Sequence, residues 1–359
     1  MISGNLIARG RSFLTGTILL CTLSFAQVGT PVPVLCYHGF ADDTTAIQGK
    51  LTEKYRRFDE MLQFLSSHGY QTVFPEELDE VDAPIKKPII LTFDDGRKDQ
   101  LRAAEMMKER GMRGIFFIVP SRISSGRAEF MTNDDIALLS AQGHQIGVHG
   151  SSHRSMVESP EEKEAVRTQA LSVIKDAVPS QTVFPSFAYP FGHYDTSVVE
   201  VVTELYRYLH TVSPGYWDRR SHHIPRMLIT SDKPVEFLQD YVLRSYEFRA
   251  SLNSLIKDGA QASVVPFRIV GRVSVSGLNI IAVSADREGY HYSSHSAVDV
   301  VSIRESVLRF DIRKFLKLYF QETRAVLSYA FVTGEGSSLR FLSLGQTHWV
   351  NNGEKNKLQ

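Results

Sequence analysis

The most constraining stretch of this 359-residue chain is Pro88–Gly96, with the sequence PIILTFDDG. A short apolar run bounded by Pro and Gly predicts a buried strand. The strand ends in two adjacent carboxylates, Asp94 and Asp95, which repel each other and are costly to bury without partners. Such a pair can hold a metal, handle a proton or start a turn, and Asp-Gly is also a common turn pair. The stretch alone leaves these interpretations open.

The overall composition predicts a globular protein. The chain is 43% apolar and 22% charged, and its length suggests two domains. Its formal net charge is zero and no block of Lys or Arg stands out. We therefore expect no nucleic-acid partner.

The N-terminus resembles a secretory signal peptide. Two arginines precede an apolar stretch from Phe13 to Phe25, and the small residues Ser24 and Ala26 form a cleavage site. The stretch is short for a transmembrane span. We expect residues 1–26 to be a signal peptide and the protein to be secreted, periplasmic or associated with the cell envelope. An uncleaved anchor and lipidation at Cys21 are the alternatives.

After residue 26, short apolar runs alternate with amphipathic segments. Strands are expected at Val34–Tyr37, Gln71–Phe74, Ile89–Phe93, Ile115–Val119, Gln145–Val148, Phe184–Tyr189, His210–Val212 and Ile224–Ile229. Helices are expected between them, including one from Val198 to Leu209. This alternation is typical of parallel strands joined by crossover helices, and it predicts an α/β barrel or a doubly wound sheet.

Unusual polar residues follow four of these strands. His38 follows one strand, Asp94 and Asp95 follow another, His149 follows a third and the Phe191 turn follows a fourth. In α/β barrels the loops after the carboxyl ends of the strands build the active site. The convergence of four strands favours an active site over turn chemistry.

Two histidines indicate that this active site binds a metal. His149 and His153 stand four residues apart in HGSSH, close enough to bind one ion. Two imidazoles and one carboxylate form a familiar catalytic zinc set with an open position. One Asp of the pair could bind the ion while the other accepts a proton from water. We expect a divalent metal cofactor, with zinc as the leading candidate.

From about Pro33 to about Thr230 the chain resembles the polysaccharide deacetylases, also called carbohydrate esterase family four. The resemblance rests on three motifs, which are TFDDG at 92–96, HGSSH at 149–153 and FAYPFG at 187–192. It implies a distorted (β/α) barrel of the NodB-like type. It also implies that Asp94 is the general base, that Asp95, His149 and His153 bind the metal, and that a backbone N–H near Phe191 faces the oxyanion.

The chain departs from the family pattern at two positions. Gly150 stands where the family has Ser or Thr, and Ala188 stands where it often has an Arg that orients the base. The early strand that ends at His38 resembles a circularly permuted branch, the poly-N-acetylglucosamine deacetylases. In that branch, the resemblance implies that His38 is the general acid. Arg226 either replaces the missing Arg or forms a surface ion pair.

The resemblance implies a hydrolase that removes acetyl groups from an N-acetylated cell-surface or extracellular polysaccharide. Tyr194 and Trp217 fall in loops near the expected rim, where they either bind sugar rings or simply pack. A glycan-binding module without turnover, on the same barrel, is one alternative function. A metal amidohydrolase for a small non-sugar amide is the other.

The resemblance stops beyond Asp232. We expect the barrel to occupy residues 27–250, with residues 251–359 forming a smaller, mostly β domain of unknown role. Val235–Ile256 has the pattern of a helix, and short β-prone runs separated by Gly-rich turns follow it.

Overall fold

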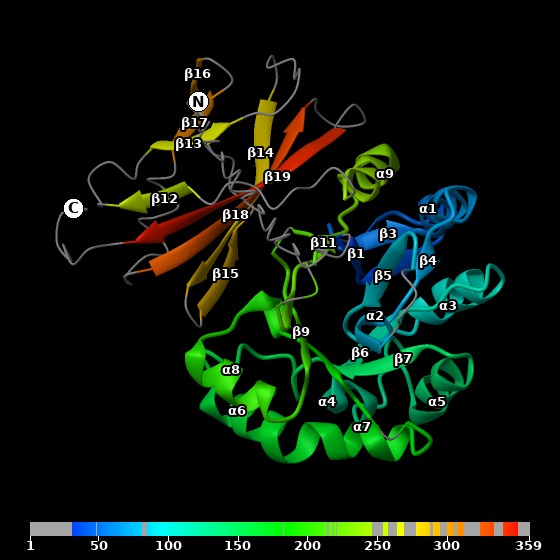
Figure 1. Ribbon diagram of the computed structural model, residues 1–359. Helices are drawn as coiled ribbons and strands as arrows, with labels where there is room; N and C mark the ends of the chain where they lie inside the picture. Colours follow the sequence, from blue (N-terminus) through cyan, green and yellow to red (C-terminus); the bar gives the residue numbers. More distant parts are fainter. Residues whose placement is uncertain are drawn as a thin grey trace, which may run out of the picture.

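The computed structural model describes residues 31–245, with short gaps at 48, 81–84, 182, 214, 218 and 220, and beyond 245 it describes strands β12 to β19. The predicted signal peptide therefore lies outside the described residues. Figure 1 shows an α/β part, coloured blue to green, and a β part, coloured yellow to red. No helix among the described residues is both long enough and apolar enough to cross a bilayer.

The α/β part is built on one sheet of nine parallel strands. Its strands are β1 (Val34–Tyr37), β4 (Gln71–Thr72), β5 (Pro88–Phe93), β6 (Ile115–Ile118), β7 (Gln145–Val148), β8 (Ser186–Ala188), β9 (Tyr208–His210), β10 (His223–Ile224) and β11 (Met227–Leu228). They follow the order β10-β9-β8-β7-β6-β5-β1-β11, and β4 pairs with β5. The predicted parallel α/β class is confirmed, and the fold is a distorted (β/α) barrel.

The connection between β10 and β11 shows that the sheet curls. These strands lie at opposite ends of the strand order, yet only Pro225 and Arg226 separate them along the chain. Because each residue spans at most about 3.6 Å, the two edges must lie close together. The single strand predicted from Ile224 to Ile229 is therefore wrong, since Pro225, which has no N–H, sits where the chain crosses between the edges.

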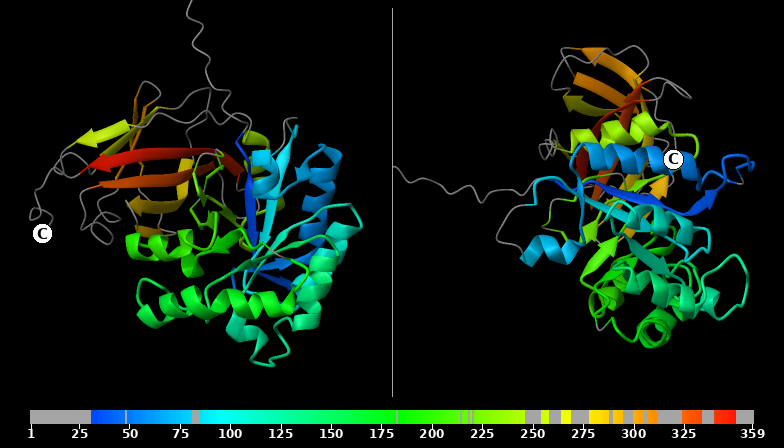
Figure 2. Two further views of the ribbon diagram at one scale, coloured as in Figure 1. Left: turned by 60° about the horizontal axis from the view of Figure 1, so that its bottom comes forward. Right: turned by 90° about the vertical axis from the view of Figure 1, so that its right-hand side faces the viewer.

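Helices and short elements fill the connections between the strands (Figure 2). They are β2 (Gly39–Ala41), β3 (Thr52–Lys54), α1 (Tyr55–Ser67), α2 (Pro75–Glu80), α3 (Gln100–Lys108), α4 (Pro120–Ile123), α5 (Asn133–Ala141), α6 (Pro160–Ala165), η1 (Val166–Ala170), α7 (Leu171–Ala177), η2 (Pro190–Gly192), α8 (Thr196–Thr203) and α9 (Val235–Arg244). The predicted helix Val198–Leu209 is too long, because α8 ends at Thr203 and Tyr208–Leu209 belongs to β9. Short apolar runs do not distinguish a helix face from a buried strand.

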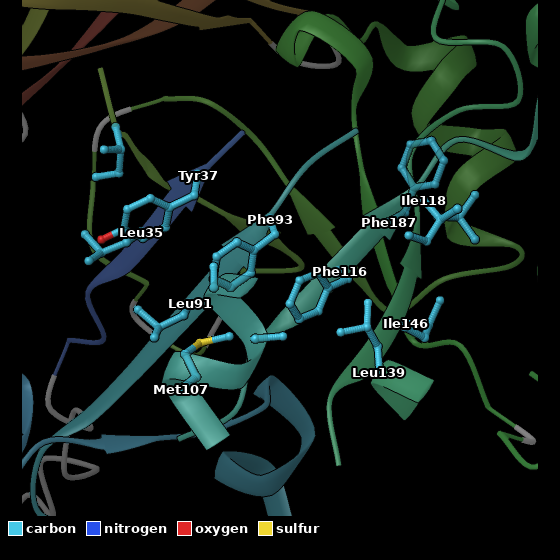
Figure 3. Close-up of a cluster of buried hydrophobic side chains, with 14 of the residues drawn as sticks. Leu35, Tyr37, Leu91, Phe93, Met107, Phe116, Ile118, Leu139, Ile146 and Phe187 are labelled. Carbon is cyan, nitrogen blue, oxygen red and sulfur yellow. The ribbon is translucent and has the colours of Figure 1, made fainter. Parts of the chain in front are cut away.

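The period of two along each strand divides the core into two layers. Leu35, Leu91 and Phe116 lie in a layer that also contains Met107 of α3 and Leu139 of α5 (Figure 3). The alternate strand residues, among them Val34, Ile90 and Phe117, form a separate buried cluster. This second face is the interior of the curled sheet, because most members of its cluster are strand residues and Leu78 of α2 is its one residue from a helix.

Beyond residue 245 every described element is a strand. The strands are β12 (Ser254–Lys257), β13 (Val264–Arg268), β14 (Leu278–Arg287), β15 (Tyr290–Ser294), β16 (Val300–Arg304), β17 (Val307–Asp311), β18 (Arg324–Thr333) and β19 (Arg340–Val350). They form a five-stranded and a three-stranded sheet. The helix predicted over Val235–Ile256 is too long, because α9 ends at Arg244 and Ser254–Lys257 is strand β12. Strand β19 runs beside α9, and the predicted boundary at residue 250 lies outside the described residues.

Candidate active site

Asp94 follows β5 and forms a buried ion pair with Arg226. Nη1 of Arg226 lies 2.7 Å from Oδ1 of Asp94, and Nη2 lies 2.8 Å from Oδ2. Nε of Arg226 donates to the carbonyl of Thr211 at 2.7 Å. The Arg226 side chain has no exposed area, so the alternative of a surface ion pair is wrong. Burial alone would raise the pKa of Asp94, but the Arg226 guanidinium, helped by His149 and His38, holds that pKa well below its usual range.

Asp95, His149 and His153 converge on one point. Their ligand atoms all lie within 4.8 Å of one another, and Oδ1 of Asp95 is 3.2 Å from Nε2 of His153 and 3.9 Å from Nε2 of His149. Ligand atoms about 2.0–2.2 Å from a tetrahedral zinc ion would be roughly 3.4 Å apart, which is close to these separations.

The polar atoms of this trio also fit a metal site. Nδ1 of His149 lies 2.8 Å from the carbonyl oxygen of Ala188, which assigns the ring proton to Nδ1 and leaves Nε2 with its lone pair. Oδ1 of Asp95 is buried and accepts no well-directed hydrogen bond. Burial, followed by the neighbouring His149, lowers the pKa of His153 to about 4, so its ring is neutral near pH 7. Neutral imidazoles and a carboxylate are the forms that bind a divalent ion.

Strained backbone marks the same region. The described part of the chain has four non-glycine residues with positive φ, and three of them are Asp95 at 84°, His153 at 59° and Phe191 at 61°. Such conformations cost about 1–3 kcal/mol each and cluster at functional sites. Their concentration here indicates that the geometry of the site is maintained at a cost in stability.

His38 lies beside the Asp94 carboxylate. Its Nε2 is 3.9 Å from Oδ2 of Asp94, and its side chain is 12% exposed. A neighbouring carboxylate raises the pKa of an imidazole, but in His38 burial outweighs this effect. Burial lowers the pKa below 6.5, and the opposing effect of Asp94 and Asp95 only partly offsets it.

The loop from His149 to His153 is held by Glu162 of α6. The Glu162 carboxylate accepts hydrogen bonds from the backbone N–H groups of Ser151 and Ser152, at 2.7 and 2.8 Å, and from the Ser152 hydroxyl at 2.5 Å. Gly150 has φ +70°, and a Cβ there would lie 2.9 Å from Oε1 of Glu162. A Ser or Thr would not fit at this position, and Glu162 stabilises the loop instead.

Sequence reasoning missed three polar residues that hold the site. One of them is Glu162 of α6, which holds the histidine loop. Nε2 of Gln100 donates to the carbonyls of His38 and Asp94, at 2.7 and 2.5 Å. Nη1 of Arg122, which follows β6, lies 2.6 Å from Oδ1 of Asp95. The position of Arg122 just past a strand end was the one signal that could have indicated it.

The Phe191 turn stands next to the histidines. The hydrogen bonds of η2 are donated by the N–H groups of Gly192 and His193, so the N–H of Phe191 takes no part in them. The Phe191 ring packs edge-on against His153, with ring centroids 4.6 Å apart. This side chain is 53% exposed, and it is the aromatic surface that the site presents to solvent.

Tyr194 and Trp217 do not provide such a surface. Tyr194 is buried and stacks on Tyr189 and His223, with centroids 4.5 and 4.8 Å away. Trp217 is buried in the interior cluster and pairs with Val32, which precedes β1 and lies at the amino ends of the strands. Their prediction as sugar-binding residues is corrected, and the packing alternative describes both.

A second set of ligand types, Cys36, His38 and Asp94, also lies together. Cys36 is a buried free thiol, and its Sγ donates to Oδ2 of Asp94 at 3.5 Å. Burial raises the pKa of this thiol well above its usual value. Because Arg226 already neutralises Asp94, this second set is poorly suited to a cation.

The sequence matches one known protein family. Residues 82–208 match the model of the family described as polysaccharide deacetylase. A relative from Bacillus subtilis, YxkH, which is assigned to the polysaccharide deacetylases, is 24% identical over 191 residues. The match covers 51% of this chain, and the chain spans 65% of the length of that relative.

Two solved structures share the fold. BC0361, a polysaccharide deacetylase from Bacillus cereus, superposes with a TM-score of 0.53 and 20% identity, covering 59% of this chain and 69% of the other. The deacetylase PplD from Streptococcus pyogenes, solved with acetate, also has a TM-score of 0.53 and 20% identity, covering 61% and 99%. The shares of this chain that the two superpositions cover, 59% and 61%, correspond to the extent of the α/β part.

Proposed function

We propose that this protein is a metal-dependent de-N-acetylase, because residues 82–208 match the model of the polysaccharide deacetylase family. Its substrate would be an N-acetylated polysaccharide of the cell surface or the extracellular space. The observation that carries the proposal is the trio Asp95, His149 and His153, whose ligand atoms lie within 4.8 Å of one another beside Asp94 and His38. A glycan-binding module would not require this arrangement of a metal site beside a base and an acid.

Asp95, His149 and His153 would hold the divalent ion. One carboxylate and two imidazoles suit zinc and leave a coordination position open. When bound, the ion would act as a Lewis acid toward water and toward the acetamide carbonyl. Nδ1 of His149 is fixed by its bond to a backbone carbonyl, which keeps Nε2 directed at the site.

Asp94 would accept a proton as water attacks the carbonyl carbon. Arg226 keeps Asp94 ionised and holds both of its oxygens in place, so Arg226 is a positioning residue. Because its pKa is low, Asp94 would hold this proton only briefly. Nε2 of His38, 3.9 Å away, would receive the proton and deliver it to the nitrogen as the C–N bond breaks. The products are acetate and a free amine.

The N–H of Phe191 would stabilise negative charge on the carbonyl oxygen. It is free of the hydrogen bonds of its own turn, and such donors contribute strongly when they are fixed in place before the reaction. The exposed Phe191 ring would also give a sugar ring an apolar surface beside the metal site. We further propose export directed by residues 1–26, which would bring the enzyme to such polymers.

Acetate release tests this function. Protein loaded with zinc, and the same protein stripped with a chelator, would be incubated with a panel of N-acetylated glycans and with small non-sugar acetamides. We expect metal-dependent acetate release from at least one glycan and much less from the small amides. Glycan binding without release would indicate a binding module, and release from small amides alone would indicate an amidohydrolase.

A further inference from the structure

The two carboxylates at the end of β5 each face an arginine, but the two pairs differ. Asp94 and Arg226 are 2% and 0% exposed, and the guanidinium bonds to both carboxylate oxygens. Asp95 and Arg122 are 17% and 22% exposed, and their closest contact joins Nη1 of Arg122 to Oδ1 of Asp95. The first pair is locked in the interior, whereas the second lies at the mouth of the site.

Arg122 contacts the same oxygen that the metal would use. Nη1 lies 2.6 Å from Oδ1 of Asp95, the same atom that lies 3.2 Å from Nε2 of His153 and 3.9 Å from Nε2 of His149. The short contact is not a well-directed hydrogen bond. A second contact of Nη1, 3.1 Å to the backbone oxygen of Asp95, has good hydrogen-bond geometry. The carboxylate therefore has a cationic neighbour without being saturated by it.

A second resting place for the guanidinium lies next to the site. Arg122 stacks over the Phe130 ring, with its Cζ 4.8 Å from the centroid. Its backbone is fixed, because the Arg122 N–H donates to Val119 and α4 is tied to the histidine loop through Ser121 and Ser151. The end of the side chain can therefore leave Asp95 while remaining over an aromatic face, which stabilises it there.

We propose that Arg122 is a displaceable counter-ion that competes with the divalent cation for Asp95 and thereby sets the affinity of the metal site. This inference rests on the metal site of the proposed function. Without metal, Arg122 neutralises a partly buried carboxylate that would otherwise be costly to keep ionised. With metal, the guanidinium lies within a few ångströms of a doubly charged ion and weakens its binding.

Zinc affinity of the full-length protein tests the inference directly. Chelator-stripped wild type, Arg122→Gln and Arg122→Lys would be titrated with Zn²⁺ against a chelating dye. We expect the dissociation constant of Arg122→Gln to fall roughly 10- to 100-fold because a repelling charge is removed. Arg122→Lys keeps the charge and should remain within about threefold of wild type.

Arg127, which follows α4 along the chain, offers a matched control. It also lies over Phe130, at 5.3 Å, but it pairs with Glu129 instead of the site, so Arg127→Gln should leave zinc affinity unchanged. Circular dichroism of each variant verifies folding. If Arg122→Gln folds poorly, Arg122→Lys still tests the inference, because a large change in the zinc affinity of Arg122→Lys would contradict a charge effect.

An unchanged or weaker zinc affinity in Arg122→Gln overturns the inference. A weaker affinity would mean that Arg122 positions Asp95 and does not compete for it. The proposed function is tested separately, because failure of the metal-loaded wild type to release acetate would not alter the effect of Arg122 on zinc binding.

Discussion

Replacement of Arg226 by methionine should destabilise the barrel strongly. The substitution retains most of the side-chain volume but removes the charge that faces Asp94 at 2.7 and 2.8 Å. It also leaves the Thr211 carbonyl and the Thr92 hydroxyl without their bonds to the guanidinium. Removing one partner of a buried pair costs about 3–5 kcal/mol because the remaining charge is uncompensated. This is a large share of the roughly 5–15 kcal/mol that stabilises a typical domain.

A double variant separates the contributions of charge and of packing to the stability lost in Arg226→Met. Asp94→Asn with Arg226→Met removes both charges, so it should recover about 2 kcal/mol of the loss in Arg226→Met alone. Urea denaturation followed by circular dichroism measures each free energy of unfolding. Arg207→Met is the matched control, because Arg207 pairs with Asp79 in an ion pair with a 59% exposed arginine, and exposed pairs contribute less than about 1 kcal/mol.

Two results would refute this account of the pair. One is a cost below about 1 kcal/mol for Arg226→Met, which would equal that of an exposed pair. The other is a double variant no more stable than the single one, which would show that the loss arises from packing and not from the charge of Asp94.

Three further predictions follow from the site and its surroundings. His38→Ala should lower acetate release from acetamide glycans by about 10²–10⁴-fold and affect an aryl acetate much less, since that leaving group needs no proton; equal losses would exclude the acid role. Glu162→Ala should weaken zinc binding by roughly 10- to 100-fold, because it loosens the histidine loop. Glu161→Ala, at the exposed neighbouring position, should leave zinc binding unchanged, and equal zinc affinities of the two variants would contradict this role of Glu162. Burial lowers the pKa of His144 from 6.5 to about 4, so the folded state binds fewer protons than the unfolded state and its stability falls as pH drops from about 6.5 toward 4. Between pH 7 and pH 5, the free energy of unfolding should therefore fall by about 1–2 kcal/mol less in His144→Asn than in wild type. Identical losses in urea titrations of the two proteins would show that His144 is not responsible.

The placement of the principal site residues was predictable because the strands are parallel. An apolar run followed at once by a polar residue identifies both a buried strand and its carboxyl end, and all such ends lie on one edge of the sheet. Asp94, His149 and His38 each follow a strand in this way, and the structure brings them together. Their proximity thus follows from the alternation of strands and helices.

Contacts made across the barrel could not be predicted in this way. Glu162 holds the histidine loop from a helix 10 residues farther along the chain, and Arg226 reaches Asp94 only because the sheet curls, across 132 residues. No local pattern encodes either pairing. The sequence also predicted that Tyr194 and Trp217 lie in loops near the site. Aromatic residues in loops bury their rings where they can pack against a hydrophobic cluster, and both residues are buried here.

Asp94→Asn, analysed for bound zinc and for acetate release in the same preparation, tests the central assignment most directly. Asp94 and Asp95 are adjacent, yet only Asp95 is assigned to the metal and only Asp94 to the proton. The asparagine variant should therefore bind zinc within about threefold of wild type and lose about 10²–10⁴-fold in turnover, while His149→Ala with His153→Ala should lose the metal itself. Loss of zinc from Asp94→Asn, or turnover close to that of wild type, would contradict the assignment.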